Sequence, residues 1–139
     1  MEQEKEQIIE MCINFSKRAD ALEKRAFDNG EYRLKQFVPD FNLLFDKYAY
    51  GTNNRTKFEF NFRNPQRYSA IETSVNTVIE SLSKTQYRVT FEGVQKSQSI
   101  RFLIDKKQSE WRLTYFETYG GNANHGENEG EEIWTKHNL

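Results

Sequence analysis

The chain holds few side chains of the kinds that metal binding and nucleophilic catalysis require. Its one cysteine is Cys12, and its two histidines are His125 and His137. A structural zinc site takes about four Cys or His ligands at characteristic spacing, so we expect no metal. Cys12 falls on a helical apolar stripe, which favours a small buried side chain over a nucleophile. Both histidines lie in or near a polar C-terminal stretch, where we expect solvated imidazoles and no general base.

An acid–base site is the enzymatic alternative that the residues leave open. A carboxyl group in an apolar pocket has a raised pKa, and a tyrosine beside it can act with it. Residues of the right types are Asp40, Asp46, Tyr48 and Tyr115. Nothing in their spacing selects them, because charged residues flank every predicted strand. The chain also lacks a Gly-x-Gly-x-x-Gly or phosphate loop, so we expect no catalytic residue and no cofactor.

An aromatic row with basic flanks is a second alternative, because such rows stack the bases of single-stranded RNA. The row and its flanks comprise Phe58, Phe60, Phe62, Arg55, Lys57, Arg63 and Arg67. Packing in a core explains the phenylalanines at least as well. A net charge of −1, from 20 basic and 21 acidic side chains, argues against a general nucleic-acid binder.

Helical segments come first among the elements that would position these residues. From residue 3 to 28 the apolar side chains recur at spacings of three and four, which predicts one long helix that stops at Gly30. Residues 31–50 repeat the helical spacing, but Pro39 prevents one uninterrupted helix. We therefore expect two short pieces, the second of which begins around Pro39 and ends by Gly51.

Strands follow, because the apolar period then changes from about 3.6 to 2. The first predicted strand carries the phenylalanine row at 58–62, and four more follow at 74–82, 86–92, 99–105 and 111–118. Alternation leaves one face of such a sheet to be buried, and the helices supply its cover. We predict an α+β fold: a single domain over residues 1–139 with N-terminal helices packed on a curved antiparallel sheet of about five strands.

Residues 120–131 form an acidic, Gly-rich stretch with almost nothing apolar, so we expect a mobile segment. Beyond it, Trp134 offers an apolar anchor for the body of the protein or for a partner. Residues 117–139 hold 1 basic and 5 acidic side chains, whereas residues 55–116 hold 11 and 6. An acidic tail of this kind steers a basic partner, and an unevenly charged solvated surface is the plainer interpretation.

The chain has no run of about 18 apolar residues. Its first residues after Met1 are mostly charged, unlike those of a signal peptide or a membrane span. We expect a cytoplasmic protein that makes no membrane contact.

Several local strings resemble one known group of proteins. They are LLFDKY at residues 43–48, FRNPQRY at 62–68, YRVTF at 87–91 and EWRL at 110–113. With the order of helices followed by a strand and a meander, they resemble the nuclear transport factor 2-like fold, a cystatin-like cone. More narrowly, they are similar to immunity proteins of that fold from bacterial polymorphic toxin systems. The ending at residues 133–139 fits the Trp-containing segment that closes members of the group.

The resemblance implies an immunity protein that binds one cognate toxin domain and occludes it. Toxins that act on nucleic acids or nucleotides tend to present basic clefts, which acidic side chains complement. The candidate contacts are Glu127, Glu129, Glu131 and Glu132, with Trp134 as the anchor. A homodimer formed through the sheet is also left open.

Overall fold

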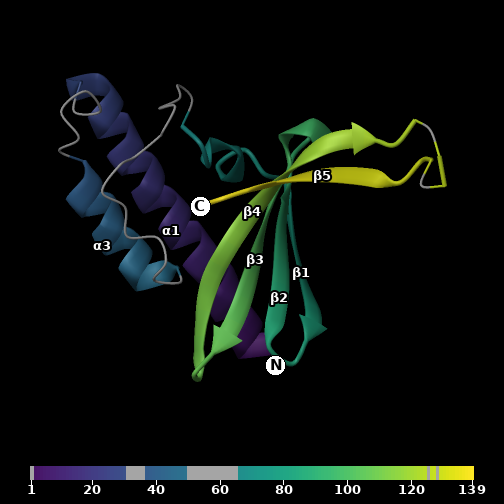
Figure 1. Cartoon of the computed structure of the whole chain (residues 1–139), viewed down its shortest axis with the longest axis horizontal. Helices are drawn as coiled ribbons and strands as arrows, with labels where there is room; N and C mark the ends of the chain where they lie inside the picture. Colours follow the sequence, from purple (N-terminus) through teal and green to yellow (C-terminus); the bar gives the residue numbers. More distant parts are fainter. Residues whose placement is uncertain (1, 31–36, 50–65, 125, 128) are drawn as a thin grey trace. The chain divides into compact units, whose positions relative to one another are not determined.

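The computed structural model describes residues 2–30, 37–49, 66–124, 126–127 and 129–139 (Figure 1). The chain forms two compact units, Met1–Ser69 and Ala70–Leu139. The described residues of the first unit are mainly helical and those of the second form an antiparallel sheet, which confirms the predicted α+β class. The predicted strand at 58–62 and the histidine at position 125 lie outside the described residues, as does most of the first short helical piece.

Helix α1 spans Glu2–Asn29, as the apolar spacing predicts. Its buried stripe includes Ile8, Cys12, Phe15 and Ala26, which a helical period places on one face. The helix ends before Gly30, whose φ of +68° is a left-handed conformation that glycine adopts without a steric penalty. Among the described residues, no helix is long and apolar enough to cross a membrane.

Helix α3 spans Val38–Tyr48 and carries Pro39 in its first turn. The N–H groups of a first turn have no acceptor within the helix, so a proline there loses no hydrogen bond. Asp40 in the first turn and Lys47 in the last turn complement the helix dipole. The predicted second helical piece is therefore confirmed: it begins one residue before Pro39 and ends three residues before Gly51.

Phe15 of α1 is the centre of an aromatic cluster in the helical unit. The centre of its ring lies 6.3 Å from that of Phe45, 6.0 Å from that of Tyr48 and 5.4 Å from that of Tyr68. The Tyr48 and Tyr68 rings meet it edge to face, a favourable arrangement for aromatic quadrupoles. Large aromatic side chains thus supply the buried area that a chain with 36% hydrophobic residues needs.

Two carboxylates of α1 hold the backbone that leads out of the helical unit. Glu23 Oε1 accepts a hydrogen bond from the Arg67 backbone N–H at 2.6 Å, and Asp20 Oδ1 accepts one from the Tyr68 N–H at 2.9 Å. Glu23 is buried although it is charged. Hydrogen bonds from backbone N–H groups offset the cost of removing such a carboxylate from water.

The second unit is a five-stranded meander in which every neighbouring pair is antiparallel and the strands lie in chain order. The strands are β1 (Asn76–Ser83), β2 (Gln86–Glu92), β3 (Ile100–Lys107), β4 (Glu110–Asn122) and β5 (Glu132–His137). Four of them match the predicted strands within two residues, except that β4 continues to Asn122. The fifth, β5, was expected only as an apolar anchor.

The two faces of the sheet differ in the way that strand alternation dictates. On β2 and β3 the side chains of one face are buried and apolar: Val89, Phe91, Ile100, Phe102 and Ile104. The intervening positions carry Arg88, Thr90 and Arg101 on the opposite face, which is polar. We call this second face the polar face. It positions the candidate site described below.

Strands β4 and β5 form a long hairpin that includes part of the acidic, Gly-rich stretch (Figure 1). The Ala123 N–H donates to the Glu131 carbonyl at 2.8 Å, and the Gly130 N–H donates to the Ala123 carbonyl at 2.8 Å. Backbone pairing therefore continues past the last residue of β4. The mobility expected for residues 120–131 stays a prediction.

Candidate functional site

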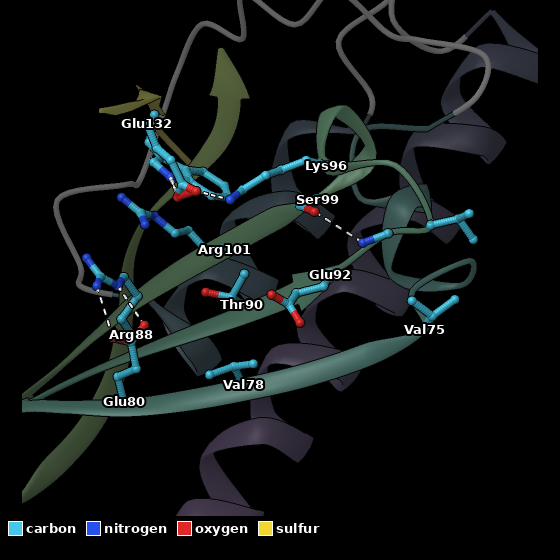
Figure 2. Close-up of a pocket in the computed structure, with 13 residues that line it drawn as sticks. Val75, Val78, Glu80, Arg88, Thr90, Glu92, Lys96, Ser99, Arg101 and Glu132 are labelled. Atoms are coloured by element: carbon cyan, nitrogen blue, oxygen red, sulfur yellow. Dashed lines mark hydrogen bonds and ion pairs between the residues drawn. The ribbon is translucent and has the colours of Figure 1, made fainter. Parts of the chain in front are cut away.

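A hollow of about 530 Å³ lies on the polar face of the sheet (Figure 2). Four strands and the turn between β2 and β3 form it. We call it the sheet hollow; its lining comprises Val75, Val78, Glu80, Arg88, Thr90, Glu92, Gly93, Val94, Lys96, Ser99, Arg101, Glu132 and Trp134. All of these residues belong to the second unit.

Strand register sets which of these side chains meet. Thr90 on β2 pairs with Arg101 on β3, which pairs with Glu117 on β4. Arg88 on β2 pairs with Glu80 on β1. Directly opposed residues on one face of an antiparallel sheet lie close enough for their side chains to interact. Each arginine therefore faces a carboxylate on a neighbouring strand.

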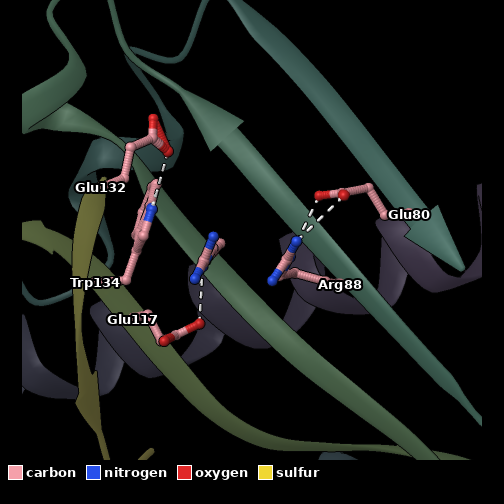
Figure 3. A network of polar contacts seen from close by, with 6 residues as sticks. Glu80, Arg88, Glu117, Glu132 and Trp134 are labelled. Atoms are coloured by element: carbon pink, nitrogen blue, oxygen red, sulfur yellow. Dashed lines mark hydrogen bonds and ion pairs between the residues drawn. The ribbon is translucent and has the colours of Figure 1, made fainter. Parts of the chain in front are cut away.

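Arg101 makes the most enclosed contacts of the site. Its Nε donates to Glu117 Oε1 at 2.8 Å, and both side chains are only 16% exposed. Its guanidinium carbon lies 4.0 Å from the centre of the Trp134 ring, within the range of a cation–π contact. The indole Nε1 of Trp134 in turn donates to Glu132 Oε1 at 3.3 Å (Figure 3). The Trp134 ring is thus fixed from two directions.

Arg88 makes a two-point contact with Glu80 on the far side of the sheet hollow (Figure 3). Arg88 Nε lies 3.3 Å from Glu80 Oε1, and Nη2 lies 3.2 Å from Oε2. This fork geometry suits a guanidinium group and a carboxylate. Both side chains are more exposed than the Arg101 pair, so water screens their attraction more strongly.

The turn between β2 and β3 brings a third cation to the rim. Lys96 forms an ion pair with Glu132 of β5, and its ammonium nitrogen lies 5.5 Å from the centre of the Tyr119 ring. The turn is close-packed at Gly93, where an added Cβ would lie 2.6 Å from the Gln98 Cβ. A glycine is therefore required for the tight turn that presents Lys96.

The residues predicted as partner contacts divide into two sets. Glu132 and Trp134 line the sheet hollow. Glu127, Glu129 and Glu131 are exposed in the β4–β5 connection and do not line it. The sequence prediction missed Arg88 and Arg101, although both occupy polar positions of strands whose alternating neighbours are buried.

The candidates for the acid–base alternative have other contacts. Asp40 forms an ion pair with Arg25 beside a groove of about 610 Å³ between α1 and α3. Tyr48 is buried, and Asp46 is exposed. Burial, followed by the charge of Glu117, raises the pKa of Tyr115 above its ordinary value of 10.0.

The predictions for Cys12 and His137 have different outcomes. Cys12 is buried as expected, and burial raises the pKa of its thiol. The expectation of a solvated imidazole was wrong for His137: its ring is half-buried and stacks on Phe116 with 4.9 Å between ring centres, and its Nε2 lies 2.8 Å from Thr118 Oγ1. Pairing of β5 with β4 holds this imidazole, which the sequence placed two residues from the C-terminus. The described residues contain no group of three metal-ligating side chains.

Comparisons with protein families, with curated proteins and with solved structures found no match for this chain. The RNA alternative also gains nothing from the described residues, because its phenylalanine row lies outside them. The class of protein that the described residues define is an α+β chain whose polar sheet face carries a hollow with paired charges and an indole ring.

Proposed function

We propose that this chain is a protein-binding module that neutralises a cognate bacterial toxin by occluding it, and that the sheet hollow is part of the binding surface. Tryptophan, tyrosine and arginine are the side chains that most often dominate protein interfaces. The sheet hollow and its rim bring together Trp134, Tyr119, Arg88 and Arg101. This composition favours a macromolecular partner.

The observation that carries the proposal is the fixed position of Trp134. Arg101 lies against its ring, Glu132 accepts from its indole nitrogen, and the Tyr119 ring meets it edge to face at 5.6 Å. An aromatic side chain that is ordered before binding loses little conformational entropy when a partner covers it. Trp134 is therefore suited to serve as the anchor of an interface.

The choice of a toxin as the partner rests on the sequence strings that resemble immunity proteins. The acidic side chains at the tip of the β4–β5 hairpin support it, because Glu127, Glu129 and Glu131 are exposed and free to approach a basic cleft. Charges of this kind accelerate encounter and set the register of the complex.

A growth assay tests the proposal. Cells that express the toxin domain encoded in a neighbouring reading frame would grow when this chain is co-expressed. Trp134→Ala would weaken binding by about 30-fold, as expected for an anchor worth roughly 2 kcal/mol, and growth would fail. Ile133→Ala is the matched control, since this exposed neighbour on β5 points to the opposite face. If the toxin-expressing cells grew equally well with and without this chain, the proposal would be overturned.

A small polar molecule in the sheet hollow is the second candidate. The volume of about 530 Å³ falls within the range of roughly 300–1,000 Å³ typical of ligand pockets. Under this alternative, native mass spectrometry of the purified chain would detect a bound small molecule that Trp134→Ala releases. The toxin assay would then show no effect of Trp134.

A further inference from the structure

The charges around the sheet hollow are paired, with one exception. Arg88 is paired with Glu80, Arg101 with Glu117, and Lys96 with Glu132. Glu92 also lines the hollow, and its Oε1 accepts a hydrogen bond of 2.8 Å from the Asn76 side-chain amide. Within the ranges that the structure describes, no Lys, Arg or His side chain forms an ion pair with Glu92. One oxygen of this carboxylate is therefore not engaged by a described side chain.

Three valines line the sheet hollow together with Glu92. Val75 and Val94 are 65% and 78% exposed, and Val78 lies on the neighbouring strand β1. Figure 2 shows Glu92 between Thr90 and Val75, with Val78 close to them. Exposed valines at the rim of a hollow are unfavourable in water and are stabilised when an apolar surface covers them.

One kind of group matches both features. Lysine and arginine carry an apolar stem that ends in a cation, so the stem can cover the valines while the head reaches the carboxylate. A hydrogen bond between an ionised donor and a carboxylate is about twice as strong as a neutral one. The hollow and its ion pairs hold four carboxylates, those of Glu80, Glu92, Glu117 and Glu132, against the three cations Arg88, Lys96 and Arg101. The charge arrangement therefore favours a cation over an anion.

We propose that the sheet hollow binds a lysine or arginine side chain of the partner protein, with Glu92 as its counter-ion. This inference rests on the proposed protein-binding function and specifies what the partner presents. Glu92 on β2 and Trp134 on β5 line the same hollow, so one surface combines an aromatic anchor with a charge-specific subsite. A basic toxin cleft supplies such a side chain.

A titration with a small probe tests the inference without the partner. The probe is Nα-acetyl-lysine methylamide, and the matched neutral probe is the same compound acetylated at Nε. The cationic probe is expected to shift the backbone amide signals of Val78, Thr90, Glu92 and Val94 in heteronuclear NMR spectra at low salt. The neutral probe is expected to leave them in place. Equal shifts with both probes, or no shifts at all, would overturn the inference.

Two variants localise the charge. Glu92→Gln keeps an oxygen that accepts from Asn76 but removes the charge, and it is expected to weaken binding of the cationic probe by about tenfold. Glu127→Gln removes an exposed carboxylate outside the sheet hollow and is expected to leave the affinity unchanged. An equal loss in both variants would show a general effect of net charge and would contradict the assignment of Glu92.

The same variant separates this inference from the function on which it rests. If Trp134→Ala abolishes toxin neutralisation while Glu92→Gln neutralises fully and the probe does not bind, the cation subsite is wrong and the proposed function stands. If the probe binds through Glu92 while toxin neutralisation does not depend on Trp134, the cation subsite stands and the toxin proposal is wrong.

Discussion

Arg101 and Trp134 are joined across the full width of strand β4. The guanidinium carbon on β3 lies 4.0 Å from the ring centre on β5, and Glu117 on the intervening strand accepts from Arg101 Nε at 2.8 Å. One arginine thus connects three strands on the polar face. The edge strand β5 is held by this contact in addition to its backbone pairing with β4.

The Arg101 contact is expected to stabilise the fold more than the Arg88 contact does. Arg101→Ala would leave the largely enclosed Glu117 without this partner and is expected to lower the free energy of unfolding by about 2–3 kcal/mol. Arg88→Ala is the matched control, because its pair with Glu80 is more exposed and is worth at most about 1 kcal/mol. Urea unfolding followed by circular dichroism measures both values. Equal losses would contradict the ranking.

Glu23 is expected to stabilise the fold because its carboxylate accepts a hydrogen bond from a backbone N–H group within the helical unit. Glu23→Ala removes the acceptor of the Arg67 N–H and is expected to destabilise the protein by about 1–3 kcal/mol. Glu23→Gln keeps a side-chain oxygen and is expected to lose less. Lys24→Ala, at the exposed next position, should change the urea midpoint little. A midpoint for Glu23→Ala equal to that of Lys24→Ala would count against the role of this hydrogen bond.

Stability is expected to fall at alkaline pH. Burial raises the pKa of Cys12 above its ordinary value of 9.0 and that of Tyr68 above 10.0. The folded state therefore holds more protons than the unfolded state once the pH exceeds about 9. Below that pH, these protonated groups contribute their full stabilisation. As the pH rises further, each group lowers the free energy of unfolding by up to about 1.4 kcal/mol per pH unit.

Urea unfolding between pH 7 and pH 11 measures this dependence. Cys12→Ala removes one of the two groups, so its stability should decline less steeply above pH 9 than that of the unaltered chain. The slope is the readout, because the substitution also changes packing in the core at every pH. Parallel curves for the two proteins would show that the Cys12 thiol does not contribute.

Under the proposed function, the acidic tip of the β4–β5 hairpin is expected to set the rate at which the toxin binds. Replacing Glu127, Glu129 and Glu131 together with Gln should lower the association rate constant and make it less sensitive to salt, while the dissociation rate changes little. Stopped-flow measurements at several salt concentrations distinguish the two rates. Deleting residues 120–139 is a poorer test, because it would also remove strand β5. If the association rate constant of the triple variant kept the salt dependence of the unaltered chain, charges other than these three would steer the encounter.

Local periodicity accounts for the parts of the fold that the sequence predicted well. The spacing of Cys12, Phe15 and Ala26 specified α1, and the alternation through β2 and β3 specified which side chains would be buried. Each of these patterns is repeated several times within one element. The polar ending after residue 118 lacked such a pattern, and the strand character of Gly120 and of residues 132–137 was missed for that reason.

The sequence by itself determined the α+β class, the bounds of α1 and α3, four of the strands, and the choice of Trp134 and Glu132 as residues of interest. Only the tertiary structure decided that Arg101, Glu117 and Trp134 meet, and that Glu92 lacks a cation within the described part of the sheet hollow. The physical reason is that periodicity is encoded within each strand. Register between strands instead depends on turns and on packing across the whole sheet, which no spacing within one strand specifies.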